Sequence, residues 1–266
     1  MEKIISDKRS GHSLKVMVKD ITIGGDELVF ISGPCAVEDY EKMKQICKGL
    51  KDKGVQILRA GAYKPRTSPY DFQGLGLEGL KILRKVGDEF KMPVVSEIMD
   101  ARDIEESLKY IDMVQVGSRN MYNYTLLKEL GKLKVPVLLK RGMSATLMEW
   151  LYAAEYVLKE GNENVVLCER GIRTFETSTR NTLDLNSVAI IKDNYRLPVI
   201  VDPSHGTGRR ELVSSMSNAA VASGADGLII ESHVCPDNSI SDARQTIDIE
   251  SVGKIIDKCT KIKALL

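Results

Sequence analysis

The feature that most constrains the fold is a strict alternation of short apolar runs with amphipathic stretches. Eight runs rich in β-branched residues occur at positions 28–32, 55–58, 93–95, 113–116, 136–139, 164–167, 198–201 and 227–230. Runs this uniformly apolar are typical of parallel strands that are buried on both faces. The sequence therefore predicts eight buried parallel strands.

Each apolar run is followed by a stretch with helical periodicity. Apolar residues recur there at spacings of three and four, with charged residues between them, at positions 40–53, 77–90, 103–110, 124–133, 145–160, 183–194, 210–223 and 250–262. Eight strand–helix units with short loops favour an α/β fold closed into a (β/α)8 (TIM) barrel over an open sheet. The length of 266 residues fits, because such barrels use about 250 residues as one domain.

The residues before the first predicted strand have the pattern of a small hairpin. Val16, Val18, Ile21 and Ile23 alternate along the chain, and Gly24-Gly25 offers a turn. We expect this hairpin to cover the bottom of the barrel. The predicted organisation is an N-terminal extension over residues 1–27 and a single barrel domain over residues 28–266, which no linker rich in Gly, Ser or Pro interrupts.

Charge and composition exclude several classes of partner. The 38 Lys and Arg residues nearly balance the 37 Asp and Glu residues, so no overall positive field favours nucleic acid or acidic membranes. No stretch approaches the roughly 20 apolar residues of a membrane span, and residues 1–19 are too charged for a secretory leader. We therefore expect a cytoplasmic protein without a nucleic-acid or membrane partner. Its five cysteines are scattered and contain no C-x-x-C pair, which predicts reduced thiols.

Polar residues follow every predicted strand, at the end where barrel enzymes carry their active sites. They include Cys35, Arg59 with Lys64 and Arg66, Glu97, Ser118 with Arg119, Lys140, Arg170, His205 and Glu231. A single one of these residues could simply meet solvent as its strand leaves the core. Five of the eight strand ends bring cations, the weakest case being Arg209 with Arg210. Eight coincident cases therefore predict a positively charged mouth.

The chemistry of these cations predicts the kind of substrate. Arginine presents a planar fork of donors that matches carboxylate and phosphate groups, and lysine supplies a compact charge. A mixed ring suits a small ligand that carries both groups. Phosphorylated keto acids fit this description.

A second group of residues at the same end has the composition of a metal site. Cys35, His205, Glu231 and Asp242 follow the first, seventh and eighth strands, and the first and eighth strands are neighbours in a closed barrel. A thiolate, an imidazole and two carboxylates suit Mn, Fe, Co or Zn better than Mg or Ca. The alternatives are a buried apolar role for Cys35, a loop cap at His205, and His233 or Cys235 as rival ligands. Cys47 and Cys259 fall in predicted helices and are interpreted as structural.

Several long motifs carry a resemblance to a known family. They are Gly33-Pro34-Cys35, Lys64-Pro65-Arg66-Thr67-Ser68, Phe72-Gln73-Gly74-Leu75-Gly76, Lys140-Arg141-Gly142, Asp202-Pro203-Ser204-His205 and the segment 231–242. With them the sequence closely resembles the type Iβ 3-deoxy-D-arabino-heptulosonate 7-phosphate synthases from about residue 14 onward. The resemblance implies a transferase that condenses phosphoenolpyruvate with erythrose 4-phosphate and water. The products are the seven-carbon keto-acid phosphate and inorganic phosphate, in the first step of the shikimate route to chorismate and the aromatic amino acids.

The resemblance also implies roles for individual residues. A divalent metal that activates the sugar aldehyde is held by Cys35, His205, Glu231 and Asp242. Phosphoenolpyruvate is bound by Arg59, Lys64, Arg119, Lys140 and Arg170, with Glu97 and Ser118 nearby. The phosphate of erythrose 4-phosphate is bound by Arg66 and Thr67. The residues implied in catalysis are Cys35, His205 and Lys64, the last as a general acid or base.

Regulation and assembly are further expectations from the resemblance. Type Iβ relatives often carry an N-terminal regulatory domain, and only about 30 residues precede the first predicted strand here. We therefore expect a bare catalytic barrel that aromatic amino acids and prephenate do not inhibit, although a separately encoded regulator stays open. The family implies a homotetramer. The physiological metal, the residue that moves the proton and the exact oligomeric state are left open.

Three alternative functions have discriminating features. The runner-up is 3-deoxy-octulosonate 8-phosphate synthase, which uses arabinose 5-phosphate and carries a Lys-Ala-Asn-Arg-Ser type of loop where this chain has Lys64 to Ser68. Sialic acid synthases are a more distant possibility. A phosphosugar-binding barrel without catalysis is disfavoured, because neither the metal set nor the cationic ring shows a gap.

Overall fold

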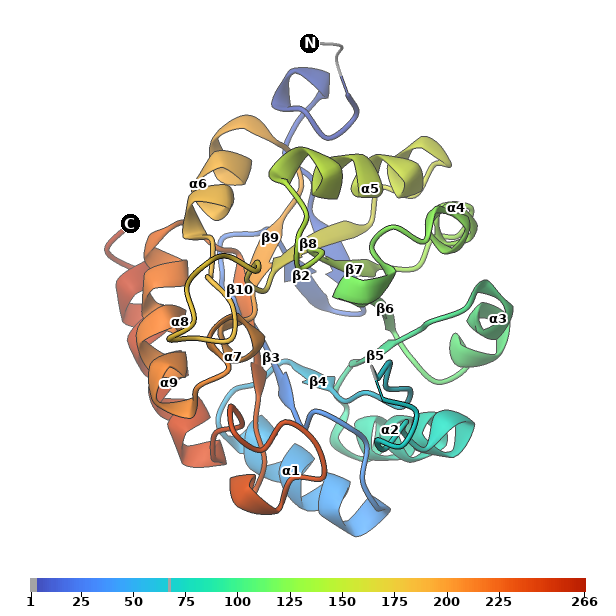
Figure 1. The fold of residues 1–266 in the computed structure, drawn as a ribbon, viewed down its shortest axis with the longest axis vertical. Coiled ribbons are helices and arrows are strands. Elements are labelled where there is room, and N and C mark those ends of the chain that lie inside the picture. Colours follow the sequence, from blue (N-terminus) through green and yellow to red (C-terminus); the bar gives the residue numbers. More distant parts are fainter. Residues whose placement is uncertain (1–3, 67) are drawn as a thin grey trace.

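The computed structural model describes residues 4–66 and 68–266, and its centre is a closed barrel of parallel strands (Figure 1). The eight strands are β3 (Val29–Gly33), β4 (Ile57–Arg59), β5 (Val94–Glu97), β6 (Met113–Val116), β7 (Val137–Lys140), β8 (Val165–Glu169), β9 (Val199–Val201) and β10 (Gly227–Glu231). β10 pairs with β3 from Gly227↔Val29 to Glu231↔Gly33, which closes the ring. The predicted barrel is confirmed.

Helices surround the ring of strands (Figure 1). They are α1 (Tyr40–Asp52), α2 (Gly76–Phe90), α3 (Ile104–Ser107), α4 (Tyr124–Gly131), α5 (Leu147–Lys159), α6 (Leu185–Asn194), α8 (Val213–Ala222) and α9 (Ile249–Lys263). Each lies within or within one residue of a predicted stretch. The largest fully buried side chain, Trp150 of α5, donates a hydrogen bond from Nε1 to the carbonyl oxygen of Leu139 in β7 at 3.1 Å. This bond fastens a covering helix to the barrel.

The strands continue further toward the mouth than the apolar pattern indicates. The last residues of β4, β5, β7, β8 and β10 are Arg59, Glu97, Lys140, Glu169 and Glu231. All five are buried, so their backbone groups stay within the parallel ladder although their side chains are charged. These five charged side chains are therefore carried by the rigid barrel and not by the loops beyond it.

A ninth helix, α7 (Pro203–Thr207), was not predicted and begins directly after β9. Asp202 caps its N-terminus by accepting from the backbone N–H of His205, and Pro203 occupies the first turn. Both residue types are favoured at these positions. Gly208, with φ of 65°, ends the helix in the left-handed conformation. The segment read as a loop is thus a short, well-capped helix.

The N-terminal hairpin is present but turns elsewhere than expected. β1 (Val16–Val18) pairs antiparallel with β2 (Ile21–Ile23). The two-residue loop between them is Lys19-Asp20, with Lys19 at φ 53°, so the predicted turn at Gly24-Gly25 is wrong. Positive φ values suit the twist of short hairpins even when glycine is absent. Gly24 instead leads toward β3.

The hairpin packs against the N-terminal end of the barrel. Val16, Val18 and Ile23 are fully buried in one cluster with inward-facing barrel residues such as Val29 and Ile31. This arrangement leaves the opposite end of the barrel for the polar residues. The division of the chain at residue 28 stays a prediction. Within the described residues, no helix has both the length and the apolar character that crossing a membrane requires.

Candidate active site and metal centre

The C-terminal ends of the strands open into a cleft that gathers most of the predicted site residues. Its lining includes Arg59, Lys64, Arg66, Glu97, Ser118, Arg119, Lys140, Arg170, His205 and Asp242. Cys35 and Glu231 lie buried beside His205 and Asp242. Thr67 lies outside the described residues. Segments that are far apart in the sequence therefore meet at one mouth.

The cleft carries an excess of positive charge. Seven Arg and Lys side chains line it, against two carboxylates. Arg170 is buried, and its Nη1 donates a hydrogen bond to the carbonyl oxygen of Gly171 at 3.2 Å. No carboxylate within the described residues forms an ion pair with this guanidinium, and burial lowers its pKa. A buried charge without a partner is costly, so the site favours an anionic ligand.

Arg59 adds to this anion-binding character. Its Nη1 donates to the carbonyl oxygen of Pro34 at 2.7 Å and lies 3.1 Å from Glu231 Oε1. Its Nε is buried and has no hydrogen-bond partner among the described residues. A fork with a spare donor at the cleft wall suits a carboxylate or phosphate oxygen.

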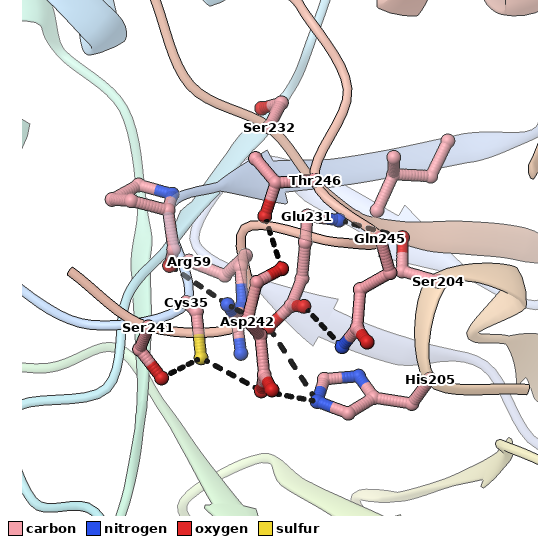
Figure 2. Close-up of polar contacts among 12 residues, drawn as sticks. Cys35, Arg59, Ser204, His205, Glu231, Ser232, Ser241, Asp242, Gln245 and Thr246 are labelled. Atoms are coloured by element: carbon pink, nitrogen blue, oxygen red, sulfur yellow. Dashed lines mark hydrogen bonds and ion pairs between the residues drawn. The ribbon is translucent and has the colours of Figure 1, made fainter. Parts of the chain in front are cut away.

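The four predicted metal ligands face one another (Figure 2). Donor atoms of Cys35, Glu231 and Asp242 all lie within 4.8 Å of one another. Asp242 Oδ2 is 3.2 Å from Cys35 Sγ and 3.8 Å from His205 Nε2, while Glu231 Oε1 is 3.5 Å from the same Nε2. Asp242 therefore lies between the thiol and the imidazole. A thiol, an imidazole and two carboxylates in this arrangement fit a divalent transition metal.

The electrostatics of this cluster follow from burial and from the neighbouring charges. Burial and the charge of Glu231 raise the pKa of the Cys35 thiol to about 12. Burial opposes ionisation of Asp242, but the charge of His205 and the hydrogen bond from Cys35 outweigh it and lower its pKa to about 2. The pKa of Glu231 is also lowered, because His205 and Arg59 outweigh burial. At neutral pH the cluster thus combines two carboxylates with a protonated thiol.

The loop after β10 orients the carboxylates of Glu231 and Asp242. Asp242 has φ of 54°, a left-handed conformation that Asp tolerates better than most residues. Its carbonyl oxygen accepts from Thr246 Oγ1 at 3.0 Å. Gln245 Nε2 donates to Glu231 Oε2 at 2.7 Å, which leaves Oε1 toward His205 (Figure 2). A short segment therefore fixes both carboxylates.

Lys64 lies where the cationic cleft meets the thiol. Its Nζ donates to the carbonyl oxygen of Cys35 at 2.9 Å and to Cys35 Sγ at 3.0 Å. Arg66 donates from Nε to the carbonyl oxygen of Phe72 at 3.0 Å and from Nη2 to Ser241 Oγ. The loop after β4 thus contacts the loop that carries Asp242.

Glu97 depends on a glycine for its position. Its Oε2 accepts from Gln115 Nε2 at 3.2 Å. A Cβ on Gly117 would lie 2.1 Å from Glu97 Oε1, which is closer than any side chain allows. Glycine at the end of β6 therefore makes room for the carboxylate beside Ser118.

Some residues of the cleft were missed, and two were wrongly expected there. Arg180 lines the cleft and places Nη1 3.5 Å from Asp242 Oδ1, but it lies in an irregular polar segment without a motif. Gln115 was detectable, because it is a polar residue inside an apolar run. Arg209 and Arg210 do not line the cleft and instead pair with nearby carboxylates, Glu211 and Asp237. Their charges are already compensated at the surface.

The rival metal ligands are not part of the described cluster. His233 is buried with Nε2 3.2 Å from Glu38 Oε1, and its Nδ1 accepts from the backbone N–H of Cys235 at 2.9 Å. Cys235 itself is exposed. Cys47 and Cys259 are buried in α1 and α9.

A closed barrel with a cationic mouth beside a thiol, imidazole and carboxylate cluster defines a class: a (β/α)8 enzyme that acts on small anionic substrates. The model of the DAHP synthetase I family matches residues 4–264. The chain therefore belongs to the DAHP synthetase I family.

Individual relatives agree with this assignment. The phospho-2-dehydro-3-deoxyheptonate aldolase of Thermotoga maritima is 44% identical over 98% of this chain and 77% of its own length. A crystal structure of the Thermotoga maritima DAHP synthase superposes with a TM-score of 0.95 at 42% identity, over 98% of this chain and 77% of that one. The 2-dehydro-3-deoxyphosphooctonate aldolase of Geobacter sulfurreducens is more distant, at 29% identity over 95% of this chain and 98% of its own length.

Proposed function

We propose that this chain condenses phosphoenolpyruvate with erythrose 4-phosphate and water, giving 3-deoxy-D-arabino-heptulosonate 7-phosphate and phosphate, and that it needs a divalent metal. Family membership supports the reaction. The observation that carries the proposal is the pairing of an undercompensated cationic cleft with the Cys35, Glu231 and Asp242 cluster at the same mouth. One part suits a carboxylate and a phosphate, and the other suits a cation.

Phosphoenolpyruvate is assigned to the cationic cleft. Its carboxylate and phosphate are taken by Arg59, Lys64, Arg119, Lys140 and Arg170. Two features of the described residues support this assignment: Arg59 Nε has no hydrogen-bond partner among them, and Arg170 has no carboxylate partner among them. A carboxylate or phosphate would supply both partners. Glu97 and Ser118 border the same ligand, and Arg66 with Thr67 is assigned to the phosphate of the sugar.

The divalent metal, drawn from Mn, Fe, Co and Zn, is assigned to Cys35, His205, Glu231 and Asp242. When bound, such an ion supplies a Lewis acid that makes the aldehyde carbon of the sugar electrophilic. The donor set supports this assignment, since it mixes one soft ligand with three harder ones.

The side chains of the cleft contribute position and charge. They hold the methylene carbon of phosphoenolpyruvate against the aldehyde carbon, so that a carbon–carbon bond forms between the two substrates. Water adds to the second carbon of phosphoenolpyruvate, and the bond from that carbon to the phosphate oxygen then breaks. The cations stabilise the negative charge that gathers on the departing phosphate. Lys64, next to Cys35 Sγ, is assigned to hold or move a proton near the reacting carbons.

Phosphate release tests the function. The purified protein is given phosphoenolpyruvate with erythrose 4-phosphate or with arabinose 5-phosphate, each with and without a chelator. We expect release at least about tenfold faster with the four-carbon sugar, loss of release with the chelator, and recovery on addition of Mn²⁺ or Zn²⁺. Faster release with arabinose 5-phosphate would instead identify the octulosonate synthase activity of the more distant relatives.

Two further proposals concern location and assembly. The balanced charge and the lack of a long apolar stretch support a cytoplasmic enzyme without nucleic-acid or membrane partners, and the family resemblance supports a homotetramer. Light scattering coupled to size-exclusion chromatography tests the assembly, and a monomer at micromolar concentration would contradict it.

A further inference from the structure

Asp202 joins the two halves of the candidate site. It follows β9, is 1% exposed, and donates its backbone N–H to the carbonyl oxygen of Glu169 at 2.8 Å. Its Oδ1 accepts from the backbone N–H of His205 at 2.9 Å. Its Oδ2 lies 2.6 Å from Lys140 Nζ and 2.7 Å from His205 Nδ1. One buried carboxylate thus contacts a cation of the cleft and the imidazole of the metal cluster.

The contact with Lys140 determines where the proton between Asp202 and His205 lies. An ammonium group only donates, so Asp202 Oδ2 is the acceptor in its 2.6 Å contact with Lys140 Nζ, and this contact favours the ionised carboxylate. The same oxygen contacts His205 Nδ1. The hydrogen in that contact must therefore be on Nδ1.

The protonation of Nδ1 decides what the other ring nitrogen offers. In a neutral imidazole one nitrogen is a donor and the other an acceptor. With Nδ1 protonated, Nε2 presents its lone pair, and Nε2 is the atom that faces Glu231 Oε1 and Asp242 Oδ2 at 3.5 and 3.8 Å. This is the tautomer that a cation at the cluster requires.

We propose that Asp202 is a positioning residue that fixes His205 as a cation ligand, with its carboxylate kept as a pure acceptor by Lys140. The proposal rests on the metal site of the proposed function. A carboxylate behind a ligating imidazole typically changes metal affinity 10- to 100-fold when it is removed. We expect a loss of this size in Asp202→Ala.

Asp226 provides a matched control. It is a second buried aspartate, with Oδ1 2.6 Å from Lys192 Nζ and Oδ2 accepting from the backbone N–H of Val199 at 2.8 Å. It precedes β10, at the end of the barrel opposite the cleft. Asp226→Ala removes a comparable ion pair and backbone contact without touching the candidate site.

The first experiment measures the affinity for Zn²⁺ by competition with a fluorescent chelator, in wild type, Asp202→Ala and Asp226→Ala. We expect a 10- to 100-fold weaker affinity in Asp202→Ala and a change below about threefold in Asp226→Ala. Equal affinities in the two variants would overturn the proposal. If Cys35→Ala binds Zn²⁺ as tightly as wild type does, the proposed metal site itself is contradicted.

The second experiment needs no variant at Asp202. The chain has three histidines, so nitrogen-15 spectra of the metal-free protein resolve their tautomers, with His205→Gln identifying the signal of interest. For the neutral ring we expect Nδ1 of His205 protonated and Nε2 bare, because Nδ1 contacts the carboxylate of Asp202. A ring protonated on Nε2 would overturn the proposal, whether or not Asp202→Ala folds.

Discussion

Cation binding at the cluster should release the proton of Cys35, and its affinity should therefore depend steeply on pH. The thiol is fully buried, and burial with the charge of Glu231 raises its pKa to about 12. A metal binds the thiolate and not the thiol. Asp242, with a pKa of about 2, is already ionised near neutral pH. In the proposed metal site, Cys35 is thus the residue that must lose a proton before the cation is held.

The magnitude follows from the difference between the pKa and the working pH. At pH 7 this difference is about 5, which corresponds to about 7 kcal/mol that the cation–sulfur bond must supply. Below about pH 12 the thiolate fraction rises with pH, so the affinity rises with pH as well. Each pH unit changes the contribution of Cys35 by about 1.4 kcal/mol, or tenfold in affinity.

The assay compares wild type with Cys35→Ala, and uses Cys47→Ala as the control. Cys47 is also buried, but it lies in α1 against Met92 and away from the cluster. Co²⁺ affinity is measured at several pH values from about 6.5 to 8.5, together with the near-ultraviolet absorption of a cobalt–thiolate bond. We expect Cys35→Ala to keep its fold, lose this absorption and all activity, and show an affinity slope shallower by one proton.

Two results would refute this reasoning. One is a wild-type slope equal to that of Cys35→Ala, which would mean that no thiol proton leaves on binding. The other is full activity of Cys35→Ala after the protein has been stripped of metal. Cys47→Ala should match wild type in slope and absorption.

Three further substitutions separate binding from stability. Arg170→Leu should raise the KM for phosphoenolpyruvate by at least about tenfold in steady-state kinetics. The free energy of unfolding in urea should not fall, because the buried guanidinium has no carboxylate partner among the described residues. A fall of several kcal/mol in that free energy would contradict this. Gly117→Ala should displace Glu97, whose Oε1 lies 2.1 Å from the new Cβ. The free energy of unfolding, measured by chemical denaturation, should fall by about 1–3 kcal/mol, and an unchanged midpoint would count against the close approach. Trp150→Phe should lower the free energy of unfolding by about 1–2 kcal/mol, because the hydrogen bond to Leu139 is lost. The value of kcat should stay constant, and a changed kcat would show that α5 affects catalysis.

Much of the fold was predictable because barrel strands are buried on both faces. Their apolar runs are continuous, so all eight were located to within two residues at each end, as for Met113–Val116 of β6. The turn of the hairpin was misplaced because glycine is only one way to reach a positive φ, and Lys19 reaches it instead. Helix α7 was missed because five residues are too short for a periodic pattern.

The candidate site was predictable only as a list of residues at strand ends. The sequence placed Cys35, His205, Glu231 and Asp242 after strands that a closed barrel brings together. It contained no sign that Arg180 reaches the same cleft, since its segment has neither periodicity nor a motif. It also gave no indication that Asp202, one polar residue of a motif, contacts both Lys140 and His205.

The amino-acid sequence by itself determined the barrel, the end at which the polar residues gather and the chemical types of those residues, because periodicity and composition act locally along the chain. Only the tertiary structure decided which charges are compensated and which are free. Arg209 and Arg210 differ from Arg170 in their carboxylate partners, not in residue type. Glu211 is a sequence neighbour of Arg209, whereas Asp237 reaches Arg210 only through the packing of loops from different strands, and no local pattern encodes such a distance.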